Sequence, residues 1–231
     1  MKRSFSVRPP WPVSFLLALS IIALAVPLLA LLAMEAARLT ASERERLVGE
    51  AASSASRIAA DLDQTLNGYM AILESLATTP ALAEDDFETV YHQAVAALKP
   101  RRLFAFLRDP SGQQRFNTRL PYGAPLPNAK GTDEPVFEDG RPHVSDIVIG
   151  QVAKKPVMAV SVPVMRNEEI HYVLSLSLDP ALMKELLDRQ KLPPEWRGTI
   201  TDRNGNIIAR TRLHDEFLGK PFKEEALRDK M

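Results

Sequence analysis

The sequence predicts an α+β protein in which an apolar N-terminal helix and a long charged helix precede an antiparallel sheet with flanking helices. No charged residue occurs between Arg8 and Glu35. Over residues 35–79, apolar residues recur at steps of three or four, the period of an amphipathic helix. From residue 102 onward, short apolar runs alternate with turns rich in Asp, Asn, Gly and Pro, as antiparallel strands do. Strands that follow one another between helices are typical of the α+β class.

The apolar segment at 13–34 has the length of a transmembrane helix. A helix of about 20 apolar residues covers roughly 30 Å, the hydrocarbon thickness of a bilayer. The apolar core of a cleaved signal peptide is shorter, about 7–15 residues. The one well-formed cleavage sequence, Ala23-Leu24-Ala25, would leave an apolar new N-terminus with Pro27 beside the scissile bond. We therefore expect an uncleaved transmembrane helix at 13–34, with a cleaved signal as the alternative.

The charges around this segment predict its orientation. Lys2, Arg3 and Arg8 precede it without an acidic residue, whereas acids and bases are mixed after Glu35. By the positive-inside rule, residues 1–12 are expected in the cytoplasm and residues 35–231 outside. An external domain without cysteine suits a bacterial periplasm, so the expected location is the inner membrane of a bacterium, with the rest of the chain in the periplasm.

The composition excludes several classes of function. Lys plus Arg equals Asp plus Glu, 29 each, so no net charge attracts nucleic acid. The chain has no cysteine, which excludes disulfides and thiol chemistry. Its four histidines lack the spacing of metal ligands, and no nucleotide-binding or nucleophile motif occurs. We expect no metal, no cofactor and no catalytic residue in this chain.

A long helix at 35–79 has two possible partners for its apolar stripe. The stripe comprises Leu47, Ala51, Ala55, Ile58, Leu62, Leu66, Tyr69, Leu73 and Leu76. Residues 66–76 are expected to pack on the sheet of their own domain. Residues 47–62 fit either that role or the seam of a parallel homodimer, because they are expected close to the membrane and lack a nearby partner in sequence.

The region at 80–192 predicts one complete module. A short helix at 85–100 is followed by two strands at 102–109 and 114–120, which flank the turn sequence Asp109-Pro110-Ser111-Gly112. After a Pro- and Gly-rich loop at 121–131, strands are expected at 143–150, 155–165 and 170–178, and a helix at 181–190.

A second hairpin, at 198–211, repeats the first. Asp202, Gly205 and Thr211 have the spacing of Asp109, Gly112 and Thr118. We therefore expect residues 193–231 to begin a second, incomplete module of the same kind, and the chain to be a fragment of a longer protein.

The wording "LRDPSGQQRFNTRLPYG" together with "PVMAVSVPVM" resembles the sensor halves of rhizobial-type histidine kinases. With the order of elements above, the chain is similar to the double-Cache (PAS-like) extracellular sensor domains of bacterial receptors, and 80–192 would be the membrane-distal module. Amino-acid-binding members of that family carry Arg-x-Trp-Tyr in the distal pocket. This sequence has Arg119-Leu120-Pro121-Tyr122 instead.

A ligand pocket is expected between the sheet and a cover at 121–140. Polar residues that interrupt apolar strands are the candidates, because a buried polar group without a partner costs about 1–3 kcal/mol. An arginine there would suit a carboxylate-bearing ligand. The candidate ligand-binding residues are Asn117, Arg119, Tyr122, Ser145, Asp146 and Ser161.

The resemblance implies the N-terminal sensory part of a bacterial inner-membrane receptor that binds a small extracellular ligand. The output in the full-length parent would be a histidine kinase of a two-component system, and a chemoreceptor or a diguanylate cyclase is the alternative. A membrane-anchored periplasmic hydrolase or scaffold protein is an alternative of another class. The expected partners are a small molecule, the lipid bilayer and a second copy of the chain.

Overall fold

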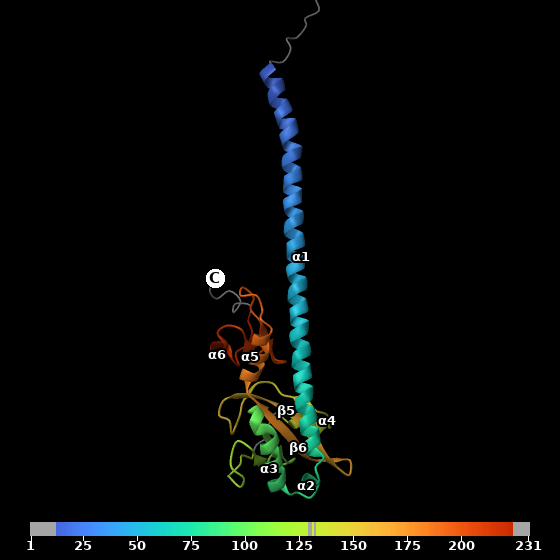
Figure 1. Ribbon diagram of the computed structural model, residues 1–231, viewed down its shortest axis with the longest axis vertical. Helices are drawn as coiled ribbons and strands as arrows, with labels where there is room; N and C mark the ends of the chain where they lie inside the picture. The colour runs from blue at the N-terminus through green and yellow to red at the C-terminus, as the bar shows by residue number, and fades with distance from the viewer. Residues whose placement is uncertain (1–12, 129–130, 132, 224–231) are drawn as a thin grey trace, which may run out of the picture. The chain divides into compact units, whose positions relative to one another are not determined.

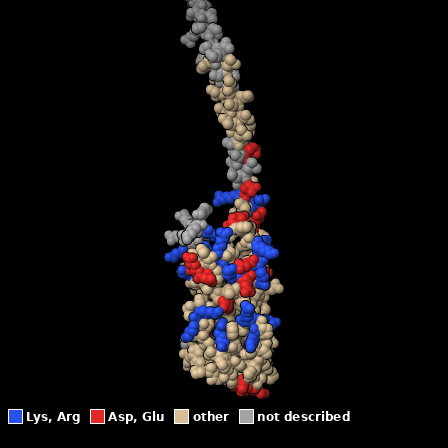
Figure 2. All heavy atoms as spheres, turned by 60° about the vertical axis from the view of Figure 1, so that its left-hand side comes forward, with Lys and Arg blue, Asp and Glu red and all other residues tan. Residues whose placement is uncertain are grey.

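The computed structural model describes residues 13–128, 131 and 133–223. It divides into two compact units, Met1–Ser53 and Ser54–Met231. Figure 1 shows the course of the chain within them. Figure 2 shows basic and acidic side chains interspersed over the viewed face of the second unit, in keeping with a net charge of zero.

Helix α1 runs over Val13–Ala77 and contributes to both units. In the first unit the large apolar side chains that the structure describes are exposed, from 44% for Phe15 to 76% for Leu24. The helix predicted at 13–34 is therefore present, but its assignment as a membrane span is not supported: within the described part of the chain, no helix combines the length and the apolar character that a bilayer crossing needs. The segment predicted to be cytoplasmic, 1–12, lies outside the described residues.

The second unit is built on an antiparallel sheet with strand order β2-β1-β6-β5-β3, and β4 also pairs with β5. The long β5–β6 hairpin lies at its centre (Figure 1). Its strands are β1 Phe104–Arg108, β2 Gln114–Asn117, β3 His143–Val144, β4 Val148–Ile149, β5 Pro156–Arg166 and β6 Glu169–Leu178.

The single strand predicted at 143–150 is wrong, because the structure has two short strands there. Between them the Ser145 hydroxyl donates to the Asp146 carbonyl at 2.8 Å and accepts the Ala159 amide at 2.9 Å. A serine that bonds neighbouring backbone groups competes with the regular ladder. The strand therefore breaks at Ser145.

The core lies on one face of this sheet. Strand alternation directs Val160, Val162, Leu174 and Leu176 to that face, where they meet the helices. These helices are the C-terminal part of α1, α2 Pro80–Ala83, α3 Phe87–Leu98 with the 3₁₀ turn η1 Lys99–Arg101, and α5 Pro180–Arg189. Asp86 caps α3 by accepting the Thr89 amide at 3.1 Å, and Asp179 caps α5 by accepting the Ala181 amide at 3.0 Å.

The apolar stripe of α1 reaches further into this core than the sequence predicted. Leu73 and Leu76 are buried, as expected for the part that packs on the sheet. Ile58 and Leu62, which the sequence left open as dimer-seam residues, also pack against the same core. The positions of the expected seam that do not pack there are Leu47, Ala51 and Ala55.

The C-terminal part forms a separate two-stranded sheet, β7 Thr199–Thr201 and β8 Ile207–Arg210, as predicted. Its Ile208 and Ala209 join the core cluster beside α5. Two short helices complete the description, α4 Glu134–Asp139 and α6 His214–Phe217.

Candidate ligand-binding site

A cavity of about 390 Å³ lies on the sheet face opposite the core. The same alternation that buries Leu174 and Leu176 turns Ser177 to this side, together with Phe106 of β1 and Ala159 of β5. The cavity is within the range of small-molecule sites in proteins, about 300–1,000 Å³. Its lining residues are Phe106, Arg108, Gln114, Asn117, Arg119, Gly131, Glu134, Val148, Ile149, Gly150, Gln151, Val152, Ala153, Val157, Met158, Ala159 and Ser177.

The segment that covers the cavity differs in part from the predicted one. The predicted cover at 121–140 contributes Gly131 and Glu134. The larger part of the cover is the run 148–153, which comprises β4 and the turn that leads to β5. Val148 and Ile149 are 38% and 67% exposed, so two apolar side chains border the mouth of the cavity.

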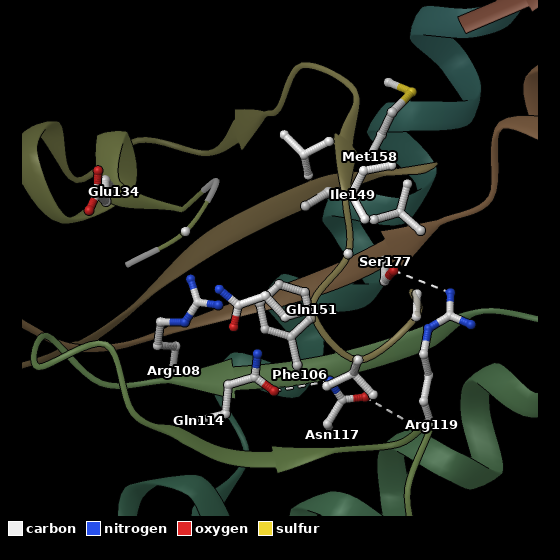
Figure 3. Close-up of a pocket in the computed structure, with 17 residues that line it drawn as sticks. Phe106, Arg108, Gln114, Asn117, Arg119, Glu134, Ile149, Gln151, Met158 and Ser177 are labelled. Atoms are coloured by element: carbon white, nitrogen blue, oxygen red, sulfur yellow. Dashed lines mark hydrogen bonds between the residues drawn. The ribbon is translucent and has the colours of Figure 1, made fainter. Parts of the chain in front are cut away.

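One end of the cavity holds a chain of three hydrogen bonds, which Figure 3 shows as dashed lines. The Asn117 amide nitrogen donates to Gln114 Oε1 at 3.0 Å. Asn117 Oδ1 accepts the backbone N–H of Arg119 at 3.1 Å. Arg119 Nη2 then donates to Ser177 Oγ at 3.2 Å. These bonds fix four polar side chains from β2, β6 and the residues that follow β2.

The Arg119 guanidinium is half-buried and lies over an aromatic ring. Its central carbon is 3.9 Å from the centroid of Phe104, a cation–π distance. Burial lowers its pKa, which the charge of Asp179 partly opposes, and the group stays charged at neutral pH. Its Nε is buried and has no partner among the described residues. This arginine can therefore bind an anionic group of a ligand by donating hydrogen bonds to it.

The second arginine of the cavity already has an internal partner. Arg108 forms an ion pair with Asp133, and both side chains are buried. Burial raises the pKa of Asp133, although the neighbouring Arg108 acts against that shift. A Cβ at Gly131 would overlap the Arg108 guanidinium, so a larger residue there would have to displace that side chain. The charge of Arg108 is thus compensated within the protein.

The structure brings two of the six predicted site residues, Asn117 and Arg119, together in the cavity. Tyr122 lies outside it, 41% exposed, with its ring 5.5 Å from that of Tyr91. Ser161 is buried inside the sheet and shares a hydrogen bond of 2.8 Å with Ser175. The remaining two predictions lie at the break between β3 and β4.

At that break, Ser145 bonds backbone groups, and Asp146 binds the turn of the second hairpin. Asp146 accepts the Arg203 amide at 3.1 Å and the Asn204 side chain at 2.9 Å. Neither residue lines the cavity. Their polar atoms serve the backbone and the contact with the β7–β8 turn.

The prediction omitted Arg108, Gln114, Gln151 and Ser177, which also line the cavity. For two of them a signal exists in the sequence. Arg108 ends the apolar run "FAFLR" in register with Phe106, and Ser177 interrupts "VLSLSL" as Ser161 interrupts its own strand. Gln151 lies in a loop without a pattern, so only the tertiary structure identifies it.

No family model and no curated protein matches the chain. Solved structures do. The sensor domain of the histidine kinase DctB from V. cholerae is 14% identical over 80% of this chain and 75% of that chain, with a TM-score of 0.58. The ligand-binding domain of the Campylobacter jejuni chemoreceptor Tlp3, in complex with L-valine, is 15% identical over 74% of this chain and 73% of that chain, with a TM-score of 0.55.

A third similar structure is the ligand-binding domain of the Pseudomonas aeruginosa amino acid chemoreceptor PctC in complex with GABA. It is 14% identical over 74% of this chain and 77% of that chain, with a TM-score of 0.55. The chain therefore has the fold of the sensor domains of bacterial chemoreceptors and histidine kinases. The resemblance to Cache-type sensor domains is confirmed at the level of the fold.

Proposed function

We propose that the chain is the N-terminal sensory part of a bacterial membrane receptor that binds a small extracellular ligand in the cavity beneath 148–153. The observation that best supports this function is the cavity itself, where a series of hydrogen-bonded polar side chains includes the charged Arg119. The fold supports the same function, since similar domains bind L-valine and GABA in their own structures.

Binding can be tested by thermal-shift screening of the full chain, kept in detergent solution, with organic acids, amines and nucleobases. A ligand of the cavity should raise the unfolding temperature because it binds the folded state alone. Arg119→Ala should weaken that ligand, whereas Asp146→Ala, a substitution outside the cavity, should leave its affinity unchanged. A ligand insensitive to Arg119→Ala would place binding elsewhere, and no stabilising compound in any of the three classes would contradict the proposal.

The membrane anchor at 13–34 belongs to this proposal. Its support is the uncharged sequence and the exposure of its large apolar side chains, which in water would be costly. In this arrangement residues 1–12 are cytoplasmic and residues 35–231 periplasmic. An alkaline phosphatase fusion after Leu192 should be active in intact cells, and a fusion within 1–12 should not be. Activity of the second fusion alone would reverse the orientation.

A homodimer through α1 is the proposed assembly, with Leu47, Ala51 and Ala55 as its seam. Leu47 is 47% exposed and the stripe continues at helical spacing toward Ala55. Cysteines introduced at Ala51 and Ala55 should crosslink two chains more readily than a cysteine at Ser53, on another face of the helix. Equal crosslinking at all three positions would contradict the proposed seam.

The output domain and the module boundaries are also proposals. A histidine kinase is the proposed output, by analogy with the domain from DctB. Residues 80–192 are proposed as the membrane-distal module and 193–231 as the start of a second one. The gene sequence beyond residue 231 tests both: a second membrane span followed by a kinase core would agree with them, whereas a chemoreceptor signalling helix or a cyclase domain would replace the kinase.

A further inference from the structure

The part of the cavity wall formed by Gln114, Asn117, Arg119 and Ser177 presents hydrogen-bond donors, because the side-chain oxygens there already accept hydrogen bonds. The backbone N–H of Arg119 can only donate, so the atom of Asn117 that faces it must be the amide oxygen. The amide nitrogen of Asn117 then faces Gln114, whose facing atom must be Oε1. One main-chain N–H thus determines the orientation of two side-chain amides.

The nitrogen of Gln114 is left free by this arrangement. Its Nε2 has no partner among the described residues, and Figure 3 shows it directed toward the space between Phe106 and Arg108. At the other end, Ser177 Oγ accepts a bond from Arg119 Nη2. Arg119 lines the cavity, and its buried Nε has no partner among the described residues. A ligand therefore meets amide and guanidinium N–H groups.

Acidic groups are scarce around the same space. Among the described lining residues the acid is Glu134, an exposed residue on α4, and Figure 3 places it at the edge of the view away from Arg119. Asp133 is held by Arg108, and Asp179 binds Lys155 and caps α5. Asp179, whose charge acts on Arg119, is not a lining residue, so no carboxylate of the described lining lies beside Arg119 to hold a ligand ammonium group.

The remaining wall is apolar. Phe106 and Val157 from the sheet and Val148 and Ile149 from the cover contribute apolar lining. The cavity therefore offers one positive charge that no lining carboxylate pairs, a neutral N–H donor on the same wall, and apolar surface for the body of a ligand. An ammonium group bound beside Arg119 would lose its hydration near a like charge, and the side-chain oxygens of Asn117 and Ser177 there are already engaged.

We propose that this cavity selects carboxylates that lack an ammonium group: organic acids with one carboxylate and an apolar body. The carboxylate binds Arg119, and the apolar body lies between Phe106 and the cover, where the Gln114 amide N–H adds a neutral donor. α-Amino acids of the same skeleton are rejected. This inference rests on the proposed sensory function and narrows its ligand.

Matched pairs of compounds test the proposal. Titration calorimetry of the full chain in detergent at neutral pH would compare 3-phenylpropanoate with L-phenylalanine, 4-methylpentanoate with L-leucine, and 3-methylbutanoate with L-valine. We expect each acid to bind about tenfold or more tightly than its amino acid, the factor that an unsatisfied buried donor produces. 2-Phenylethylamine should not bind.

Two substitutions separate the roles of the donors. Arg119→Met should weaken binding of the organic acids about tenfold or more. Arg141→Met removes the same charge at an exposed site outside the cavity and should leave this affinity unchanged. Gln114→Glu keeps the oxygen that Asn117 needs but replaces the free N–H by a carboxylate. This substitution should weaken binding of the organic acids, and it should reduce or reverse the difference in affinity between the acids and the amino acids.

The outcomes distinguish a failure of the proposed selectivity from a failure of the proposed sensory function. Amino acids that bind as tightly as the acids, and lose affinity in Arg119→Met, would overturn the selectivity and leave the sensory function standing. A series in which neither compound of any pair binds, and in which Arg119→Met changes nothing, would overturn the selectivity and count against the cavity as the sensory site.

Discussion

The β1–β2 and β7–β8 hairpins of the second unit have the same turn but different neighbours. In both, the glycine amide donates to the carbonyl of the aspartate three residues earlier, at 3.0 Å for Gly112 and 3.1 Å for Gly205. Both glycines have positive φ, 89° and 78°. The threonine that ends each hairpin also bonds the opposite strand: Thr118 Oγ1 accepts the Ala105 amide at 2.9 Å, and Thr211 Oγ1 accepts the Gly198 amide at 3.2 Å.

The side chains on these matched backbones differ in chemistry. Where the first hairpin has Gln114 and Asn117 on the cavity side, the second has Ile207 and Arg210 at the corresponding positions. The first hairpin pairs with β6 inside the large sheet, whereas β7 and β8 pair with each other. The comparison shows that the turn residues determine the backbone path of a hairpin. The side chains at the strand positions determine whether that hairpin can contribute to a ligand site.

The largest expected effect concerns the core position of each hairpin. Phe116 is 1% exposed and meets Tyr91 edge to face at 6.2 Å, whereas its counterpart Ala209 is buried with almost no side chain. Phe116→Ala should lower the free energy of unfolding by about 3–5 kcal/mol, because it leaves a cavity in the core. Ala209→Gly should lower it by about 1 kcal/mol. Urea unfolding of the full chain measures both.

Equal losses in these two variants would contradict the view that the first hairpin is part of the main core and the second is an attachment to it. Val148→Ala provides a control, because its side chain is 38% exposed at the mouth of the cavity. It should change the free energy of unfolding by less than about 1 kcal/mol.

The turn carboxylates should have a smaller and pH-dependent effect. Burial alone would raise the pKa of Asp109, but hydrogen bonds from Ser111 and Gln113 and the charge of Arg115 outweigh it and lower the pKa. Burial would also raise the pKa of Asp202, but hydrogen bonds from the side chain and backbone of Asn206 outweigh it and lower that pKa. A folded-state pKa below the unfolded value of about 3.9 stabilises the protein above that pH.

This stabilisation should be lost as the pH falls from about 5 to about 2, through the lowered pKa of each group. Asp109→Asn or Asp202→Asn should each lower the free energy of unfolding at neutral pH by about 1–3 kcal/mol, the range for hydrogen bonds to a charged group. Each variant should also lose part of the acid dependence seen in the unmodified chain. A variant with an unchanged acid dependence would show that its carboxylate is not held in the folded state.

Much of this fold is predictable because its signals are local. The Asp–Gly turn, the two capping aspartates and the alternation of β5 and β6 depend on residues within a few positions of one another. The break in the predicted strand at 143–150 is not local, since it depends on the Ser145 hydroxyl meeting Ala159.

The candidate site follows the same division. Asn117 and Arg119 could be chosen because they end an apolar strand, and both line the cavity. Gln151 and the rest of the cover could not, because nothing near them in sequence shows which sheet face they lie on. Asp146 has the signal of a site residue but binds the second hairpin instead. A polar residue in an apolar strand indicates a partner without identifying it.

The smallest expected effect concerns the contact that the second hairpin makes and the first does not. Arg203 Nη2 donates to the Val144 carbonyl at 2.8 Å, and its Nη1 lies 3.3 Å from His143 Nε2. The matched residue of the first hairpin is Pro110, which has no donor to offer. Burial lowers the pKa of His143 and the charge of Arg203 lowers it further, while Asp139 and Asp146 act in the opposite direction.

Because the pKa of His143 lies below its unfolded value of about 6.5, the unfolded state binds the proton more readily, and stability falls as the pH drops below that value. Protonation also removes the acceptor that faces Arg203 and places two positive charges together. Amide hydrogen exchange at 202–206, corrected for intrinsic rates, should therefore increase a few-fold between about pH 7.5 and about pH 5.5. Exchange at 109–113 should not change. Arg203→Ala should raise exchange at 202–206 at both pH values and abolish the difference; a pH dependence that persists in this variant would show that another group releases the turn.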